Sequence, residues 1–351
     1  MNGKSINSDE RKVRIGVVNW DCSLPSSTFF GYYQTRTLSP KKYRTWTPFY
    51  ADILGENKID YHTRAQEEYD RELRYAIDSG IDYFAFVFYP DKEALKESDI
   101  GDERWENCVY ELNYARLMYE SSSLKDKIGM ALIIGASDHY ERDYKEIARL
   151  MQEPHYEKID GRPIIYLFSH ERKYVEGVRR AVEEINGKEP LFFAMISRIP
   201  CEGDDFSYVD GISAYACGKS DIDNYCEILE AAISENEGRA GSGKLTVPIF
   251  PMGWNPSPRI DIPSPWVKYG NKNYASPATA DELMCGGDRF SEWLFEKKKS
   301  SKNITDHILT FAWNEFEEGG WICPTYNEDL SINAERVDVF AEIVRRWKKI
   351  L

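Results

Sequence analysis

The chain has 351 residues, of which 42% are hydrophobic and 14% aromatic. This content fills a large core and excludes an intrinsically disordered protein. The 59 acidic residues outnumber the 45 basic ones, which gives a net charge of −14 at pH 7. Such a chain repels phosphate backbones and anionic lipid surfaces, so neither nucleic acid nor a membrane is expected as its main partner.

Short apolar stretches alternate with segments of helical periodicity along the chain, and together they predict strands and helices in turn. The expected strands are 14–19, 81–89, 128–135, 163–168, 191–196, 209–213, 246–250 and 307–312. The expected helices are 65–79, 103–122, 143–152, 174–185, 222–234, 289–299 and 334–349. The stretch 81–89 is too apolar to alternate, as expected for a parallel strand covered on both faces.

Eight strands separated mostly by helices favour a closed (β/α)₈ barrel, an α/β fold. The alternative is an open doubly wound sheet, but no G-x-G-x-x-G motif follows a strand. Barrels of this kind hold ~200 to over 400 residues in one unit. We therefore expect a single domain over residues 1–351, with residues 1–11 as a flexible tail.

Two loop segments stand out. Residues 236–244 are rich in glycine and charge and are expected to form a flexible surface turn. Residues 253–277 follow the seventh strand and contain Trp254, Trp266 and Tyr269. In a barrel, this long loop would overhang the C-terminal face, where active sites lie.

The seven cysteines are scattered and never spaced C-x-x-C, so we expect reduced, buried thiols and no disulfide framework or zinc site. The histidines also lack the mutual spacing of metal ligands, and neither a metal nor a cofactor is expected. Walker A, H-E-x-x-H and G-x-S-x-G motifs are absent from the sequence. Without an apolar leader or an 18-residue apolar stretch, the chain as written is expected to be cytoplasmic, or exported if a signal peptide has been trimmed.

The strongest chemical signal follows the eighth strand, in the segment FAWNEFEEGGW at residues 311–321. Glu315 and Glu318 are three positions apart, and in a tight turn this spacing lets both side chains face one cavity. Cleavage of a glycosidic bond needs a proton donor for the leaving oxygen and a second carboxylate. Two nearby carboxylates in unequal surroundings can take these two roles. A solvated helix N-terminus is the alternative interpretation of the acidic run.

Other candidate contacts lie at the ends of the expected strands. Trp313 and Trp321, beside the glutamates, are expected to offer apolar platforms for sugar faces. Trp20 ends the first strand and is a candidate for binding. Asp138 and His139 follow the third strand and are candidates for contacts with substrate hydroxyls, although a helix N-cap at Ser137 or Asp138 is the alternative.

The loop after the seventh strand adds Trp254, Asn255 and Arg259. Trp254 is a candidate platform for a sugar ring, and Arg259 a candidate contact for an anionic group. Loop packing and an ion pair are the respective alternatives.

The segment AWNEFEEGGWICPT resembles the N-E-W-x-E-G-x-x-x-x-P signature of the glycoside hydrolase family 99-like group, which includes endo-α-mannosidases and WbsX-type proteins. Four further blocks occur in the order of that family and extend the resemblance over roughly residues 10–345: SGIDYFAFVFY, PHYEKIDGRPIIYLF, YVDGISAY and PMGWNPSPR. The chain departs from the family pattern at Phe316, Cys323 and Asn255, which affects the expected substrate contacts.

The resemblance implies a (β/α)₈ fold and an α-linked, manno-configured or related oligo- or polysaccharide substrate. By motif position, Glu315 corresponds to the base that deprotonates the sugar 2-hydroxyl, and Glu318 to the general acid/base at the leaving oxygen. In the mannosidase members, the 2-hydroxyl closes a 1,2-anhydro sugar with net retention. Tyr215 matches a tyrosine that lines the reactive subsite, and Asn314 is placed to orient Glu315.

Two other functions remain open. WbsX-type relatives are often associated with glycosyltransferases of polysaccharide assembly, although this sequence has no D-x-D motif or glycine-rich phosphate loop. A barrel that binds carbohydrate without cleaving it is the third hypothesis. The sugar, the linkage and the oligomeric state do not follow from the sequence.

Overall fold

The computed structural model describes residues 13–20, 23–97, 106–270 and 272–351. The tail expected at residues 1–11 lies outside the described residues. So does the start of the helix expected at 103–122.

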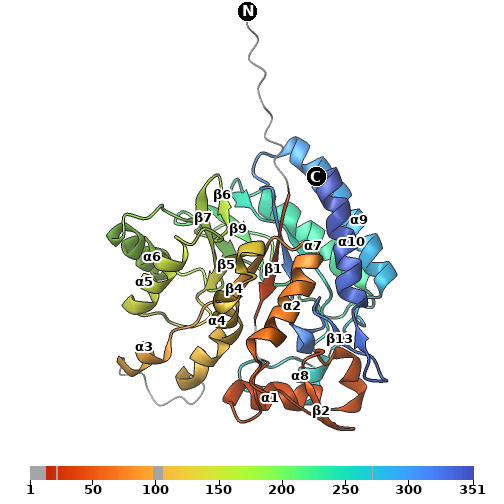
Figure 1. Cartoon of the computed structure of the whole chain (residues 1–351). Coiled ribbons are helices and arrows are strands. Elements are labelled where there is room, and N and C mark those ends of the chain that lie inside the picture. The colour runs from red at the N-terminus through yellow and green to blue at the C-terminus, as the bar shows by residue number, and fades with distance from the viewer. Residues whose placement is uncertain (1–12, 21–22, 98–105, 271) are drawn as a thin grey trace, which may run out of the picture.

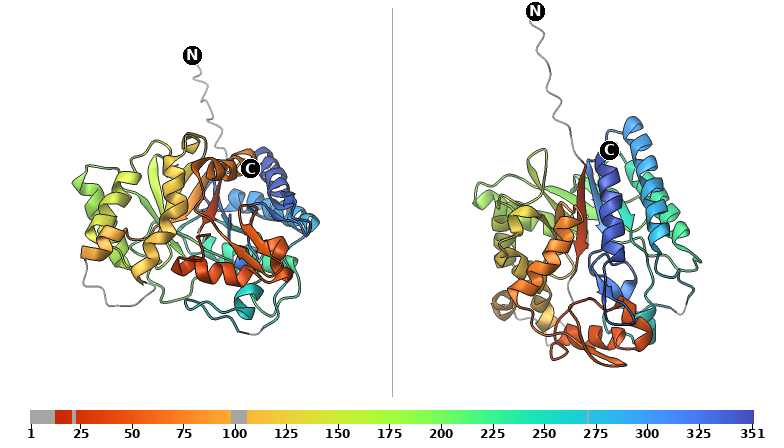
Figure 2. Two further views of the ribbon diagram at one scale, coloured as in Figure 1. Left: turned by 60° about the horizontal axis from the view of Figure 1, so that its bottom comes forward. Right: turned by 45° about the vertical axis from the view of Figure 1, so that its right-hand side comes forward.

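The core is a ring of parallel strands (Figures 1 and 2). In chain order, they are β1 (Arg14–Asn19), β4 (Tyr83–Val87), β5 (Gly129–Ile134), β7 (Arg162–Leu167), β8 (Leu191–Met195), β9 (Gly211–Ser213), β10 (Leu245–Thr246), β11 (Ile249–Pro251) and β12 (His307–Phe311). Their spatial order is β10-β9-β8-β7-β5-β4-β1-β12-β11. A two-residue antiparallel strand, β6 (Lys158–Ile159), is paired with β7.

The two ends of this order are consecutive pieces of one chain segment, and this closes the ring. Strand β10 pairs with β9, and β11 pairs with β12. Between them, the Val247 amide donates to the Ile212 carbonyl at 3.1 Å, and the Leu309 amide donates to the Pro248 carbonyl at 2.9 Å. The predicted (β/α)₈ barrel is therefore confirmed.

Helices cover the outside of the ring (Figure 2). They are α2 (Gln66–Asp78), α4 (Tyr114–Ser121), α5 (Glu141–Leu150), α6 (Arg172–Glu184), α7 (Tyr225–Ala240), α9 (Ala280–Ser300) and α10 (Glu335–Ile350). The last helix, α10, packs against both α9 and α2, so the outer layer closes as the strands do. No helix of the described residues is long and apolar enough to span a membrane.

All eight predicted strands occur, but the helix expected at 103–122 and the flexible turn expected at 236–244 are wrong in part. Only the second half of the helix expected at 103–122 is α-helical, because η2 (Glu106–Asn113) is a 3₁₀ segment. The flexible turn expected at 236–244 begins instead as the last turn of α7. Asn236 there is fully buried, and its side chain makes two hydrogen bonds to the backbone of Ile249. Its Nδ2 donates to the Ile249 carbonyl at 2.9 Å, and its Oδ1 accepts from the Ile249 amide at 3.0 Å. This contact anchors α7 to β11, which local composition does not reveal.

Several short elements in the segments that connect the strands and helices of the barrel were not predicted. They are α1 (Phe29–Leu38), η1 (Lys41–Trp46), the hairpin of β2 (Asp52–Gly55) and β3 (Lys58–Asp60), α3 (Lys92–Glu97), η3 (Lys125–Lys127), α8 (Ser257–Asp261), η4 (Phe316–Glu318) and the pair β13 (Thr325–Tyr326) and β14 (Ile332–Asn333). Figure 1 shows α1, β2 and α8 together at the end of the barrel away from the N-terminus. Thr28 caps the N-terminus of α1, and its hydroxyl accepts from the Gly31 amide at 3.1 Å. A side chain at Gly31 would come within 2.2 Å of the Leu24 carbonyl oxygen, so the helix requires glycine there.

The N-terminal ends of the strands hold a buried ion cluster. Glu157 accepts from Arg14 at 2.9 and 2.5 Å and is bonded to His307 Nε2 at 2.8 Å. Asp82 accepts from Arg14 at 3.3 Å and from the Ile15 amide at 2.8 Å, and Lys348 lies 2.9 Å away. Burial would raise the pKa of Glu157, but the bonds to His307 and Arg14 outweigh it and lower that pKa.

Six of the seven cysteines are described, and none of the six forms a disulfide. The expectation of buried thiols is wrong for Cys201, Cys226 and Cys285, which are exposed.

Candidate active site

The acidic segment after β12 forms a compact 3₁₀ turn that starts at Glu315 and ends at Gly319. Gly319 has φ 73°, a left-handed conformation that favours glycine. The turn is tied to the neighbouring loop by a 2.7 Å bond from the Asn255 amide to the Glu318 carbonyl. Glu315 and Glu318 are 7% and 5% exposed, so the solvated-helix interpretation is wrong.

Both glutamates line one cavity of about 440 Å³ at the C-terminal ends of the strands. The spacing of three residues in a tight turn therefore brings the two side chains together, as predicted from the sequence. Trp20, Tyr215, Trp254 and Arg259 line the same cavity, so six of the candidate residues meet there.

Arg259 on α8 lies among the three acids of the turn, Glu315, Glu317 and Glu318. Its Nη1 donates to Glu318 Oε1, and its Nη2 is 3.8 Å from Glu315 Oε2. Its Nε and Nη2 donate to Glu317 Oε2 at 3.3 and 3.1 Å. The arginine was predicted to contact an anionic group, and in the structure it faces the protein's own carboxylates. The alternative interpretation as an ion pair is thus confirmed.

Two tyrosine hydroxyls complete the contacts of the pair. Tyr215 donates to Glu315 Oε1 at 2.5 Å, and Tyr269 donates to Glu318 Oε1 at 2.6 Å. Glu318 Oε2 is buried and has no hydrogen-bond partner within the described residues. One oxygen of Glu318 is thus held by the protein, while the other remains available.

Burial is the main reason that the pKa of both carboxyls is raised. Burial, followed by the charge of Glu318, raises the pKa of Glu315 to about 8, although Arg259 and the Tyr215 hydroxyl act in the opposite direction. Burial also raises the pKa of Glu318, against the effects of Arg259 and Tyr269. A coupled pair of this kind holds a proton near neutral pH and so combines an acid with a base.

Aromatic rings from separate loops form much of the cavity wall. Trp20, Phe168 and Tyr215 meet edge to face, with centroids 5.2 to 5.3 Å apart. Trp266 packs on Phe30 with centroids 5.4 Å apart. Flat apolar surfaces next to acidic groups suit the faces and the hydroxyls of a sugar ring.

The two tryptophans beside the glutamates do not take part in this wall, so the expectation that they offer sugar platforms is wrong. Trp313 is fully buried, donates from Nε1 to Glu72 of α2 at 2.6 Å, and packs on Phe84. Trp321 lines a different, smaller hollow, where Arg336 lies 4.5 Å from its ring centroid. Both rings belong to the core behind the acidic turn.

Asn314 and Asn255 support the site without lining the cavity. Asn314 accepts from the Trp20 amide at 2.9 Å and donates to Asn19 at 3.1 Å, which joins the acidic segment to β1. Asn255 accepts from the Ser257 amide at 3.0 Å and donates to the Ala275 carbonyl at 2.7 Å. It therefore holds the start of α8, the helix that carries Arg259.

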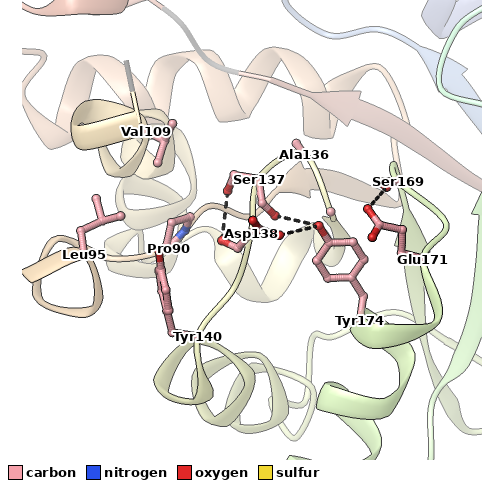
Figure 3. A pocket seen from close by; sticks show the side chains of 11 residues that line it. Pro90, Leu95, Val109, Ala136, Ser137, Asp138, Tyr140, Ser169, Glu171 and Tyr174 are labelled. Carbon is pink, nitrogen blue, oxygen red and sulfur yellow. Dashed lines mark hydrogen bonds between the residues drawn. The ribbon is translucent and has the colours of Figure 1, made fainter. Parts of the chain in front are cut away.

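Asp138 and His139 lie apart from the glutamates. Asp138 is exposed, binds Lys173 at 2.7 Å and lines a neighbouring hollow of about 340 Å³ (Figure 3). His139 accepts from the Gly135 amide at 3.1 Å, and burial lowers its pKa to about 4. The predicted hydroxyl contact is therefore wrong for His139, whose neutral ring supports the β5–α5 loop. Asp138 remains a candidate only for the neighbouring hollow, which shares Ala136 with the cavity.

Eight residues that line the cavity were not among the predicted contacts: Phe30, Tyr89, Leu112, Ala136, Phe168, Trp266, Val267 and Tyr269. For two of them, the sequence carried a usable signal, since Tyr89 and Phe168 end predicted strands. Trp266 and Tyr269 lie in the loop that was expected to overhang this face. Phe30 belongs to the unpredicted α1. Within the described residues, no group of three or more His, Cys, Asp or Glu side chains is placed to hold a metal ion.

No protein-family model matches the chain, and comparison with curated proteins finds no relative. Two solved structures of the GH99 endo-α-mannosidase from Bacteroides thetaiotaomicron are similar along nearly the whole length. One, in complex with Bis-Tris propane, has a TM-score of 0.58 and 14% identity over 96% of this chain and 97% of that chain. The other has a TM-score of 0.57 and 13% identity over 96% and 98%. At this identity, the likeness concerns the fold, and the chain is a (β/α)₈ barrel with the fold of glycoside hydrolases of the GH99 type.

Proposed function

We propose that this protein is a glycoside hydrolase that cleaves α-linked, manno-configured or related glycans. The observation that carries the proposal is the convergence of Glu315 and Glu318, both buried, on one cavity walled by aromatic rings. The fold of the GH99 endo-α-mannosidases supports the substrate class.

In the proposed reaction, Glu315 takes the proton of the sugar 2-hydroxyl while O2 attacks the anomeric carbon. The bond from that carbon to the leaving oxygen breaks, and Glu318 gives its proton to that oxygen. Water then opens the 1,2-anhydro sugar: Glu318 takes a proton from the water, and Glu315 returns one to O2. Two displacements at the anomeric carbon give net retention.

The ion pairs in the substrate-free site favour the proton on Glu315. Arg259 contacts Glu318 directly but lies 3.8 Å from Glu315, so it stabilises the negative charge of Glu318 more strongly. The proposed roles need the opposite arrangement, with the proton on Glu318. Substrate binding would therefore have to move this proton, and the free Glu318 Oε2 is an atom that can accept it.

A longer glycan would have room beyond the cavity. The neighbouring hollow is lined by Ser137, Asp138, Ser169 and Glu171 (Figure 3), and Ala136 lines both this hollow and the cavity. We propose that Asp138 contacts a second sugar of the chain there. This contact requires substrate longer than one residue.

The test uses two leaving groups on the same α-mannosyl unit: fluoride, which departs without a proton, and an alkyl alcohol, which needs one. We expect Glu318→Gln to lose about 10²–10⁴-fold of its activity on the alkyl glycoside and much less in the first-turnover release of fluoride, which precedes the step in which Glu318 takes a proton from water. Glu315→Gln is expected to lose activity on both, because O2 must be deprotonated in each case. Glu176→Gln, on the exposed face of α6, is the matched control and should behave as the parent.

Full activity of either cavity variant on the alkyl glycoside would contradict the assignment. A parent that binds oligosaccharide but cleaves no glycoside over long incubation would indicate the carbohydrate-binding barrel. A thermal shift with a nucleotide-diphosphate sugar, and none with oligosaccharide, would instead favour the role in polysaccharide assembly.

A further inference from the structure

The third acid of the turn, Glu317, is the most buried of the three at 1% exposed, and it does not line the cavity. Both of its oxygens are engaged. Thr37 on α1 donates to Oε1, while Nε and Nη2 of Arg259 both donate to Oε2. Glu317 thus connects α1 and α8 behind the cavity wall.

The contacts of Arg259 divide into a rear and a front set. Glu317 holds Nε and Nη2 from behind, at 3.3 and 3.1 Å. The front set consists of the contact of Nη1 with Glu318 and the 3.8 Å approach of Nη2 to Glu315. A planar guanidinium held through two of its nitrogens has little freedom to rotate, so the rear contacts fix the front ones.

The contact between Glu317 and Arg259 also has an electrostatic effect. The guanidinium is shared by three buried carboxyls, and the negative charge of Glu317 offsets part of its positive charge, so Arg259 stabilises the charged forms of Glu315 and Glu318 less. Among the described residues, the other groups that hydrogen-bond to these carboxyls are the hydroxyls of Tyr215, Tyr269 and Thr37.

We propose that Glu317 is a positioning residue for the reaction: it fixes the guanidinium of Arg259 against the two cavity glutamates and limits the positive charge that reaches them. The proposal rests on the proposed function, in which those two glutamates react with substrate. Nothing in the spacing of the motif assigns this role, because Glu317 faces away from the cavity.

The direction of the expected pH effect follows from the sign of the charge. The negative charge of Glu317 raises the pKa of both Glu315 and Glu318, and burial is the larger cause in each case. Removal of that charge leaves more of the Arg259 charge to the pair, so both pKa values fall.

The test is the pH dependence of kcat/KM for Glu317→Gln, which keeps the size of the side chain but loses its charge. We expect both limbs of the profile to move to lower pH by about one unit, with KM nearly unchanged because the residue does not touch the cavity. Glu176→Gln removes an exposed carboxyl and should leave the limbs in place. Limbs of Glu317→Gln that coincide with those of the parent would overturn the proposal.

Glu317→Asp separates charge from position and serves also if Glu317→Gln fails to fold. It keeps the charge but withdraws it by one methylene, so we expect the limbs to stay in place while kcat falls about tenfold. An unchanged kcat in this variant would contradict the positioning role.

A titration that needs no turnover separates this proposal from the proposed function. Carbon-13 NMR of glutamate-labelled protein, with Glu315→Gln and Glu318→Gln to identify the signals, reports the two pKa values directly. A shift to lower pH in Glu317→Gln would support the charge effect even if no glycoside were cleaved, and unshifted signals would refute it.

Discussion

The two ends of the barrel both bury glutamate beside arginine, but with opposite balances of charge. At the N-terminal ends of the strands, Glu157 is held by Arg14 and His307, and Asp82 by Arg14 and Lys348. At the C-terminal ends, three carboxyls share the one guanidinium of Arg259. The pKa of Glu157 is lowered, whereas the pKa of Glu315 is raised to about 8.

The difference shows that burial alone does not decide whether the pKa of a buried glutamate is raised or lowered. Burial is the largest single influence on both Glu157 and Glu315 and acts in the same direction on each. The number of donors and cations per carboxylate decides the outcome. The well-paired end stabilises the fold, while the underpaired end retains groups able to exchange protons.

The largest expected effect is at the paired end. Glu157→Gln leaves His307 without this carboxylate, while Arg14 keeps its contact with Asp82. The variant should lower the free energy of unfolding by about 3 kcal/mol near pH 7, a value at the lower end for a broken buried pair because Arg14 is partly exposed. Since the pKa of Glu157 is lowered in the folded state, its contribution is present above its ordinary value of 4.5 and is lost as the pH falls below it. Urea unfolding near neutral pH and at about pH 3 measures both effects. Equal losses at the two pH values would contradict the comparison.

The underpaired end should respond in the opposite sense. A carboxyl with a raised pKa favours the folded state at low pH, and this advantage is lost as the pH rises from 4.5 through about 8. Glutamine cannot ionise, so Glu315→Gln avoids the cost of a buried charge at high pH. The variant should raise the free energy of unfolding by about 2 kcal/mol near pH 8.5, with little change near pH 5. Destabilisation at the higher pH would contradict this comparison, because it would show that the Glu315 carboxylate is paired as completely as that of Glu157.

Two hydroxyl groups, one in the cavity and one in the barrel interior, offer the finest test, with expected effects of about 1 kcal/mol or less. Tyr215 donates to Glu315 and lowers its pKa, so Tyr215→Phe should move the limb of the activity profile that depends on Glu315 to higher pH by about half a unit.

Tyr166 is hydrogen-bonded to Tyr83 at 2.8 Å in the barrel interior. Tyr166→Phe should lower stability by about 1 kcal/mol and leave the pH profile unchanged. A changed profile in Tyr166→Phe would break the separation between the cavity and the barrel interior.

The barrel could be predicted from local sequence patterns. Its parallel strands are covered on both faces, so each is a continuous apolar run, such as residues 128–135, which can be recognised without knowing its neighbours in space. The helix at 103–122 was only half right, because periodicity does not distinguish a 3₁₀ segment from an α-helix. Helix α1 was missed because its aromatic and polar residues, FFGYYQTRTL, show no clear apolar stripe.

The candidate site divides in the same manner. A spacing of three residues in a tight turn brings two side chains to one side, and so the pair of Glu315 and Glu318 followed from the sequence. The sequence also placed Trp313 and Trp321 beside them, but nearness along the chain does not decide which side of the turn a ring occupies.

The amino-acid order alone therefore determined the alternation of strands and helices and the acidic pair, because each depends on contacts between residues close in the chain. Only the tertiary structure decided that Arg259, Tyr215 and Tyr269 hold that pair and that Glu317 lies behind it. The arginine and the two tyrosines are 49 to 100 positions along the chain from the glutamates they contact. The loops that carry them meet only because the barrel closes, and closure is a property of the whole chain.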